Sequence, residues 1–325
     1  MTAPLLDVTD LRTTFRAEGR TARAVDGISF TVAPEETVGL VGESGCGKSV
    51  TALSIMRLIR PPGVIEAGSR ITFESRDLLA LPEREMRAIR GARIAMVFQE
   101  PLTSLNPVLT IGAQVAEVVR VHSGASKKEA RVRAIATLES VGLPESAARA
   151  RDYPHHLSGG MRQRVMIAMA IMMRPALLIA DEPTTALDVT TQSQILGTLA
   201  ELQSSMRMSV LLITHDLGIV AERAQRVIVM YAGQIVEEAP VEELFRAPRH
   251  PYSRALLAAV PRLGAPRERL EAIPGQVPSA DAWPAGCRFR ARCPHAFDRC
   301  ATEPPLYELG GGHRSRCHLD AAAGA

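Results

Sequence analysis

Short apolar runs alternate along the chain with stretches whose apolar residues recur every three or four positions. The runs rich in β-branched and aliphatic residues predict strands at 5–15, 27–33, 37–42, 92–98, 176–181, 208–214 and 226–231. Between them, TIGAQVAEVVRVH and KKEARVRAIATLESVG have helical spacing, so residues 107–163 are predicted to be mostly helical. The alternation of strands with helices predicts an α/β core built on a mixed sheet.

The segment GESGCGKS lies between a predicted strand and a predicted helix. Its glycines allow backbone N–H groups to face an anion at the positive end of that helix. Lys48 would then bridge the β- and γ-phosphates, and the Ser49 hydroxyl would bind Mg²⁺. The pattern predicts a nucleotide-binding loop, with a plain glycine-rich turn as the alternative. The candidate ATP-binding residues here are Gly42, Glu43, Ser44, Gly45, Cys46, Gly47, Lys48, Ser49 and Val50.

A second motif, LSGGMRQR, precedes an apolar helical run and then the strand that ends in ADEP. In this order the motifs resemble the ATP-binding cassette family over residues 1–248. The resemblance implies a P-loop NTPase cassette with ATP and Mg²⁺ as cofactors. It also implies a RecA-like core, an antiparallel β subdomain and a helical subdomain at about 107–163.

The same resemblance implies roles for individual residues. Asp181 would hold Mg²⁺ together with Ser49 and Gln99, and Glu182 would polarise the attacking water. His215 corresponds to the switch histidine that contacts the γ-phosphate, so Glu182, His215 and Gln99 are the catalytic candidates. Phe15 is the candidate for stacking on adenine, with a plain strand residue as the alternative.

In this family the signature segment faces the nucleotide held by the other subunit, so hydrolysis requires a dimer. The signature residues are Leu157, Ser158, Gly159, Gly160 and Met161, and Asp188 belongs to the D-loop that runs along the partner. Met161 stands where most of the superfamily has Gln. This form, together with FQEPLTSLNPVLTIG and HPYSRALLAAVPRL, resembles the ATPase subunits of dipeptide and oligopeptide importers.

The importer resemblance implies a set of partners. Within that subgroup the methionine form is similar to the first of two non-identical ATPase subunits, which favours a heterodimer over a homodimer. Two transmembrane permease subunits and an extracytoplasmic substrate-binding protein would complete the complex. The chain is expected at the cytoplasmic face of the inner membrane, as a peripheral subunit.

Composition agrees with that placement. Among 325 residues the net charge is +3 and aromatic residues make up 4%, which gives no basis for nucleic-acid binding. No apolar run reaches the roughly 18 residues of a membrane span, and MTAPLLDVTDLRTT does not resemble a secretion signal. The alternative function is a soluble cassette ATPase in repair, translation or cluster assembly. Such proteins usually carry a second cassette, coiled coils or basic arms, which this sequence lacks.

Residues 249–325 form a different segment, rich in Pro, Gly and Arg, which we call the C-terminal extension. It contains four of the five cysteines: Cys287, Cys293, Cys300 and Cys317. Because a cytosolic chain does not depend on disulfides, this clustering predicts a small irregular segment stapled by metal. Structural zinc usually shows closely spaced pairs, so a 4Fe-4S cluster is the leading interpretation, and the importer subgroup resembled here is known for one. Zinc, with His295, His313 or His318 substituting, and unliganded thiols remain as alternatives.

Overall fold

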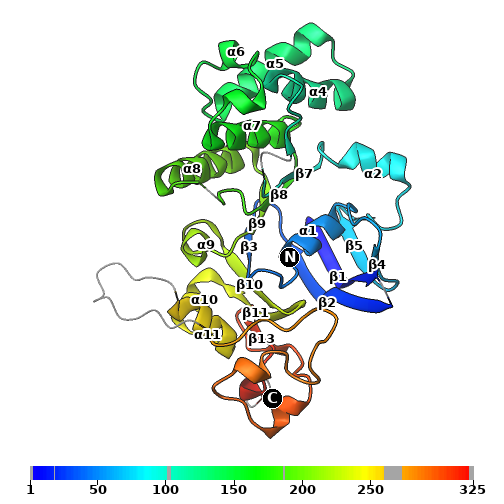
Figure 1. The fold of residues 1–325 in the computed structure, drawn as a ribbon, viewed down its shortest axis with the longest axis vertical. Helices are drawn as coiled ribbons and strands as arrows, with labels where there is room; N and C mark the ends of the chain where they lie inside the picture. Colours follow the sequence, from blue (N-terminus) through cyan, green and yellow to red (C-terminus); the bar gives the residue numbers. More distant parts are fainter. Residues whose placement is uncertain (1–2, 18, 101–103, 186, 260–272, 322–325) are drawn as a thin grey trace. The chain divides into compact units, whose positions relative to one another are not determined.

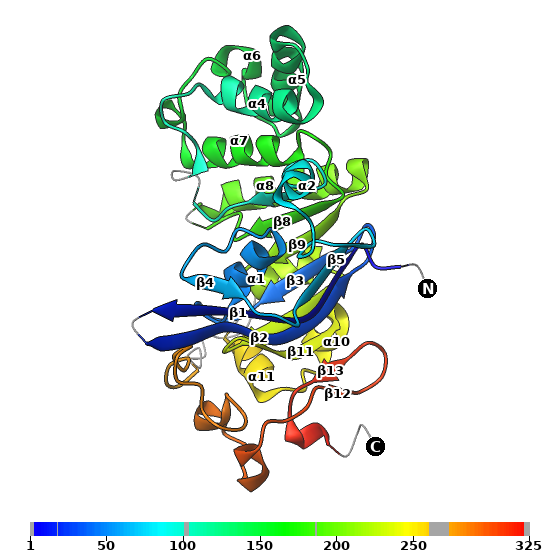
Figure 2. The same cartoon turned by 90° about the vertical axis from the view of Figure 1, so that its right-hand side faces the viewer.

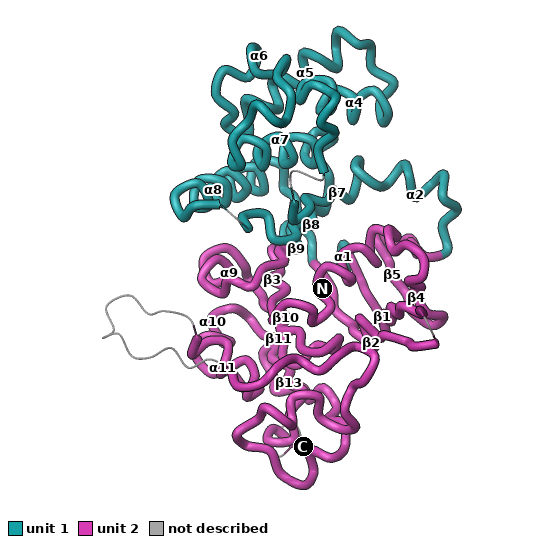
Figure 3. The backbone as a smooth tube through the Cα atoms, in the orientation of Figure 1, with its two compact units in different colours: residues 1–5, 33–36, 80–211 teal, residues 6–32, 37–79, 212–325 magenta. Residues whose placement is uncertain are grey.

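The computed structural model describes residues 3–17, 19–100, 104–185, 187–259 and 273–321 (Figure 1). The chain forms two compact units, each assembled from separate stretches of sequence (Figure 3). The first unit comprises Met1–Leu5, Ala33–Glu36 and Ala80–Leu211, and the second comprises Leu6–Val32, Thr37–Leu79 and Leu212–Ala325. Across the described residues, every helix is too short or too polar to span a bilayer.

One sheet of the second unit is antiparallel and is built around β1 (Leu6–Ala17) and β2 (Arg20–Val32), which are the two long strands seen in Figure 2. β1 also pairs with β4 (Gly63–Ile65) and β5 (Arg70–Phe73), and β5 pairs with β6 (Arg76–Asp77). The sequence predicted β2 only from residue 27, because polar residues interrupt its first half, RTARAV. Pairing with β1 extends the strand into this stretch, where pairing overrides the local pattern.

A second group of strands in this unit surrounds β3 (Thr37–Val41), whose five residues are all buried. β10 (Arg226–Tyr231) runs parallel to β3, and β11 (Gln234–Pro240) runs antiparallel to β10. The α-helices among the described residues of this unit are α1 (Lys48–Ile55), α9 (Leu217–Arg223), α10 (Val241–Arg246) and α11 (Pro251–Ala258).

The C-terminal extension shares the core of the second unit. The short strand β13 (Arg314–Ser315) pairs with β11, and β12 (Tyr307–Glu308) pairs with β13. Phe289 is buried in the same cluster as Val227 and Tyr231 of β10. The remaining described turns are the 3-10 segments Arg290–Arg292, Asp298–Ala301 and His318–Asp320. After α11, the described part of the extension has only these short elements, and its packing continues that of the strands.

The first unit contains the predicted helical region. α4 begins after the capping hydroxyl of Thr110, and α5 begins after that of Ser126. Both helices contact α7, which follows the signature segment. The helices are α2 (Glu83–Ile89), α4 (Ile111–Ser123), α5 (Lys127–Ser140), α6 (Ser146–Arg149), α7 (Gly159–Ile171) and α8 (Val189–Met206). A 3-10 turn at Pro154–His156 precedes α7.

Two parallel strands complete the described part of this unit. β7 (Ile94–Val97) and β8 (Leu177–Asp181) pair in register and are mostly buried. β9 (Ser209–Ile213) begins in the first unit and ends in the second along the sequence. The prediction of an α/β fold with an antiparallel β part and a helical part is confirmed.

Candidate active site

The glycine loop after β3 is held in a conformation that only glycine adopts easily. Gly42 has a φ of +151°, and a Cβ there would lie 2.2 Å from the carbonyl oxygen of Met230. Gly47 has a φ of +110°, and a Cβ there would lie 2.4 Å from the carbonyl oxygen of Ala24. The backbone of neighbouring strands therefore fixes the loop from two sides, and no larger residue fits at either glycine.

The Lys48 ammonium lies across the inside of this loop. Its Nζ donates to the carbonyl oxygens of Gly42 at 2.7 Å and Glu43 at 3.1 Å, and it lies 3.8 Å from Cys46 Sγ. Cys46 is fully buried, and this burial raises the pKa of its thiol, so the sulfur is neutral at neutral pH. The loop thus contains one buried cation, held by carbonyl oxygens, and this side chain supplies the positive charge that a phosphate-binding loop requires.

Glu43 links this loop to the C-terminal extension, and sequence reasoning missed the connection. Its carboxylate oxygens accept two hydrogen bonds from Arg292, at 2.7 and 2.9 Å. Its backbone N–H donates to the Tyr252 hydroxyl at 2.8 Å. Arg292 lies 249 positions away, so no local pattern could have indicated the pair.

At the end of β8, the structure brings together two of the three catalytic candidates. Gln99 Nε2 donates to Glu182 Oε2 at 3.0 Å, and Thr185 Oγ1 donates to the same oxygen at 2.8 Å. Glu182 has a φ of +47°, a left-handed conformation that non-glycine residues adopt only when their surroundings impose it. Asp181, the last residue of β8, is 4% exposed. The sequence placed Thr185 at the start of the D-loop and did not predict its contact with Glu182, which lies only three positions before it.

The third catalytic candidate, His215, lies in the second unit, just after β9, and is exposed. Asp216 follows it and caps α9, accepting from the backbone N–H groups of Gly218 at 2.8 Å and Ile219 at 3.3 Å. The chain around the imidazole is therefore anchored by a helix cap. Phe15 lies in β1, where its ring faces Gly63, and is partly exposed.

The signature segment forms the exposed start of α7. Ser158 caps this helix by accepting from the Met161 N–H at 3.3 Å, and both Ser158 and Gly159 are exposed. A Cβ on Gly160 would lie 2.5 Å from the Thr191 methyl group. Asp188 accepts from the backbone N–H of Thr191 at 2.9 Å and from its hydroxyl at 2.7 Å, and these bonds lower the pKa of Asp188. The signature and D-loop residues of one chain are thus packed together.

The four cysteines of the extension line one small cavity, together with His295 and His318. Among the described residues, no three His, Cys, Asp or Glu side chains converge as ligands of a single metal ion. The described side chains therefore form no preassembled metal site, for zinc or for an iron-sulfur cluster. His313, one of the candidate zinc ligands, instead lies 2.7 Å from the buried carboxylate of Glu237. Burial raises the pKa of the Cys287 and Cys293 thiols. It raises the pKa of the Cys317 thiol to about 12.

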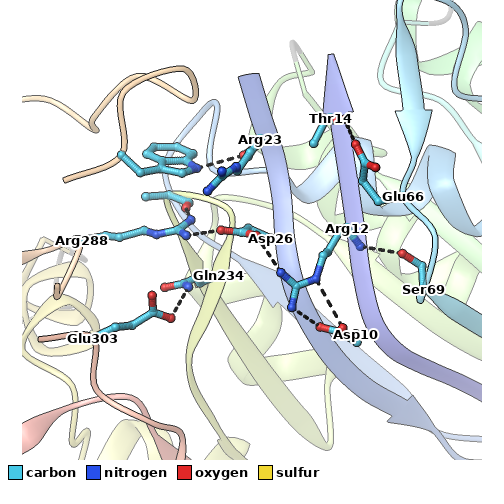
Figure 4. A network of polar contacts seen from close by, with 12 residues as sticks. Asp10, Arg12, Thr14, Arg23, Asp26, Glu66, Ser69, Gln234, Arg288 and Glu303 are labelled. Atoms are coloured by element: carbon cyan, nitrogen blue, oxygen red, sulfur yellow. Dashed lines mark hydrogen bonds and ion pairs between the residues drawn. The ribbon is translucent and has the colours of Figure 1, made fainter. Parts of the chain in front are cut away.

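Polar contacts attach the extension to the strands of its own unit (Figure 4). Arg288 donates to the carboxylate of Asp26 and to the carbonyl oxygen of Ala232. Trp283 Nε1 donates to the Arg23 carbonyl oxygen at 3.1 Å. Gln234 Nε2 donates to Glu303 at 2.7 Å, so strands β2 and β11 both hold the extension.

The phosphate-type loop, the acidic end of β8 and the signature helix together define an ATP-binding cassette ATPase. The family model described as ABC transporter matches residues 25–185. A second family model, described as the C-terminal region of oligopeptide/dipeptide transporters, matches residues 236–300.

Individual proteins that are similar to this chain in sequence or structure are also ATP-binding cassettes or transporter subunits. The dipeptide transport ATP-binding protein DppD of Escherichia coli strain K12 is 53% identical over 315 residues, covering 97% of this chain and 96% of that protein. The dimeric cassette MJ0796 bound to ADP and Pi has a TM-score of 0.65 and 28% identity, covering 73% of this chain and 98% of that one. CbiO1 of Clostridium perfringens, described as part of an ABC transporter complex, has a TM-score of 0.63 and 26% identity, covering 76% and 92%.

The chain therefore belongs to the oligopeptide/dipeptide branch of the ABC transporter family, as an ATP-binding subunit. This membership confirms the importer interpretation and the ATPase activity over the alternative of a cassette ATPase unconnected to transport. It also implies membrane permease partners.

Proposed function

We propose that this chain binds ATP at residues 42–50 and uses its hydrolysis to drive uptake of dipeptides or oligopeptides across the cytoplasmic membrane. The observation that carries the proposal is the joining, in one chain, of a complete set of cassette motifs to an extension of the oligopeptide/dipeptide transporter type. The chain would act at the inner face of the membrane, bound to two permease subunits, with an extracytoplasmic binding protein delivering the peptide.

Within this function, Lys48 binds the β- and γ-phosphates in place of its bonds to loop carbonyls, and Glu182 orients the attacking water. The bond from Gln99 to Glu182 supports a shared role for these two side chains at the reacting end of the nucleotide. His215 contacts the γ-phosphate, and Phe15 stacks on adenine. Ser49, Gln99 and Asp181 would hold Mg²⁺, since hydroxyl, amide and carboxylate oxygens are the donors this ion prefers. When bound, the ion would neutralise charge on the phosphates.

The signature segment serves the nucleotide of a second, homologous ATPase subunit. Support comes from the exposure of Ser158 and Gly159, which keeps a hydroxyl and a helix N-terminus available to a partner. Asp188 would lie at the same interface. A heterodimer predicts that the chain forms a 1:1 complex with the second ATPase subunit in the presence of ATP, measurable by mass on a sizing column.

The extension would hold a 4Fe-4S cluster through Cys287, Cys293, Cys300 and Cys317. The support for this proposal is the cavity that all four cysteines line and the affinity of thiolate sulfur for iron. When bound, such a cluster would tie together the four segments that supply the thiols. About four iron and four sulfide per chain after anaerobic purification would support it. Zinc or no metal would contradict it.

Transport in proteoliposomes tests the whole proposal. Vesicles would contain this chain, a second ATPase subunit and the permease subunits, with the binding protein and labelled dipeptide outside. We expect uptake that requires ATP inside and that Lys48→Ala abolishes. ATP hydrolysis without uptake of any peptide, and without stimulation by the loaded binding protein, would contradict peptide import.

A further inference from the structure

Glu43 creates an electrostatic problem for a loop that binds phosphate. It is the second residue of the loop, and its side chain is 30% exposed. ATP carries several negative charges, so an unpaired carboxylate in this loop would repel it. The loop therefore needs a cation that neutralises Glu43 without competing with Lys48 for the phosphates.

Arg292 of the C-terminal extension supplies this cation. Its guanidinium makes a two-point contact with the carboxylate, at 2.7 and 2.9 Å, and its side chain is only 5% exposed. Bidentate contacts of this kind are stronger and more directional than single ones. The pairing with Glu43 raises the pKa of Arg292, so the cation persists at every physiological pH.

The guanidinium is itself held in place by the extension. Its Nε donates to the Pro274 carbonyl oxygen at 2.8 Å, and its remaining donors reach the Tyr231 hydroxyl at 3.3 Å and the Ile273 carbonyl oxygen at 3.4 Å. The guanidinium carbon also lies 5.9 Å from the centre of the Phe289 ring. With these contacts fixed, Arg292 determines where the Glu43 carboxylate can lie.

Tyr252 holds the backbone of the same loop residue. Its fully buried hydroxyl accepts from the Glu43 N–H, while the Glu43 carbonyl oxygen accepts from Lys48. The rings of Tyr252 and Phe289 are packed together, with centroids 5.4 Å apart. Glu43 is thus held by the extension at its backbone and its side chain, and by Lys48 from within the loop.

We propose that Arg292 is a positioning residue for the phosphate-binding loop: by neutralising and fixing Glu43, the C-terminal extension sets the affinity of the loop for ATP. This proposal rests on the proposed ATP-binding role of residues 42–50. Phe289 and Cys293 both line the cavity that contains the four cysteines of the extension. Cys293 directly follows Arg292 in the sequence, so this cavity adjoins the residue that positions Glu43.

A double-mutant cycle in the full-length chain tests the proposal, with the dissociation constant of MgATP as the readout. Arg292→Gln leaves the carboxylate unpaired and is expected to weaken binding by about tenfold. Glu43→Gln removes the charge that Arg292 neutralises but keeps the backbone of the loop, so it should weaken binding much less than Arg292→Gln does. The double variant should bind like Glu43→Gln, because no unpaired carboxylate remains. Arg292→Lys keeps the charge but loses the two-point contact, and should lie between wild type and Arg292→Gln.

Arg288→Gln is the matched control, because Arg288 attaches the same extension to Asp26 and Ala232. Arg288→Gln should lower thermal stability without changing ATP affinity. It therefore separates weaker attachment of the extension from loss of the contact that positions Glu43. Unchanged affinity in Arg292→Gln, or a double variant as weak as Arg292→Gln alone, would overturn the proposal. Lys48→Ala tests separately whether residues 42–50 bind ATP. If this variant bound ATP at wild-type affinity, the assignment of the ATP site to this loop would fail, whatever the result of the double-mutant cycle.

Discussion

The phosphate-binding loop and the signature segment both begin a helix with small polar residues, yet their surroundings differ. The loop is exposed at its tip but enclosed at both ends: a Cβ on Gly42 or Gly47 would lie only 2.2 or 2.4 Å from a backbone carbonyl oxygen, and Lys48 is 5% exposed. The signature presents Ser158 and Gly159 to solvent. The enclosed segment has its partners within the chain, whereas the exposed one has donors available for another molecule. One chain therefore contains two unlike halves of a nucleotide site.

The largest effect should come from the end of β8. Glu182→Gln keeps the size of the side chain but removes the carboxylate that would orient water, so hydrolysis should fall by roughly a hundred- to ten-thousandfold. MgATP affinity should stay within about twofold of wild type, since the loop is untouched. Glu201→Gln, an exposed residue of α8, is the control and should leave the rate unchanged. Hydrolysis near the wild-type rate in Glu182→Gln would remove Glu182 from the mechanism.

Next comes the enclosed loop. Gly42→Ala forces a Cβ against the Met230 carbonyl and should cost roughly 2–4 kcal/mol of unfolding free energy, with loss of ATP binding. Gly45→Ala is the matched control, because a Cβ there meets no atom within 4 Å and only its φ of +79° is strained. That variant should cost about 1 kcal/mol. Chemical denaturation without nucleotide measures both, and equal losses would show that the loop is not enclosed.

A pH effect should follow from His250, which caps α11 by accepting from the Tyr252 N–H. Burial lowers its pKa to about 4, an effect that Arg316 and Arg254 support and Glu237 opposes. The unfolded chain protonates His250 more readily than the folded chain does. The stability that the neutral imidazole gives the folded state is therefore complete above about pH 6.5 and is lost as the pH falls toward 4. The loss should reach about 3 kcal/mol.

His250→Asn keeps a capping acceptor without a titrating group. Its unfolding free energy should therefore vary less between pH 6.5 and 4 than that of the wild type. Parallel pH profiles for the two proteins would contradict the assignment.

The smallest effect concerns the packing beneath the exposed signature. Gly160→Ala brings a Cβ to 2.5 Å from the Thr191 methyl group and should cost about 1–2 kcal/mol. Thr191→Ser removes that methyl group but keeps the hydroxyl that donates to Asp188. The double variant should recover most of the lost stability in thermal melts. No recovery would mean that the clash lies elsewhere.

The sequence predicted these segments unequally. The glycine loop, the acidic end of β8 and the signature segment are local patterns, in which neighbouring residues determine one another's conformation. The first half of β2 was missed although its partner in β1 is close in sequence, because its residues do not form an apolar run. The β12–β13 hairpin was missed because β13 pairs with β11, which lies far away in sequence. The contact between Glu43 and Arg292 had no local signal at all. With 38 basic and 35 acidic residues in the chain, charge alone could not select that pair.

The two unlike halves support the central proposal, which is that this chain binds ATP by itself but hydrolyses it only with a second ATPase subunit. The direct measurement is the hydrolysis rate of a dilute chain, at saturating MgATP, as the second subunit is added. We expect ATP to bind the isolated chain, and hydrolysis to appear and saturate with added partner, except when Ser158→Arg blocks the exposed signature. Full hydrolysis by the isolated chain at every dilution, unaffected by the partner, would contradict the proposal.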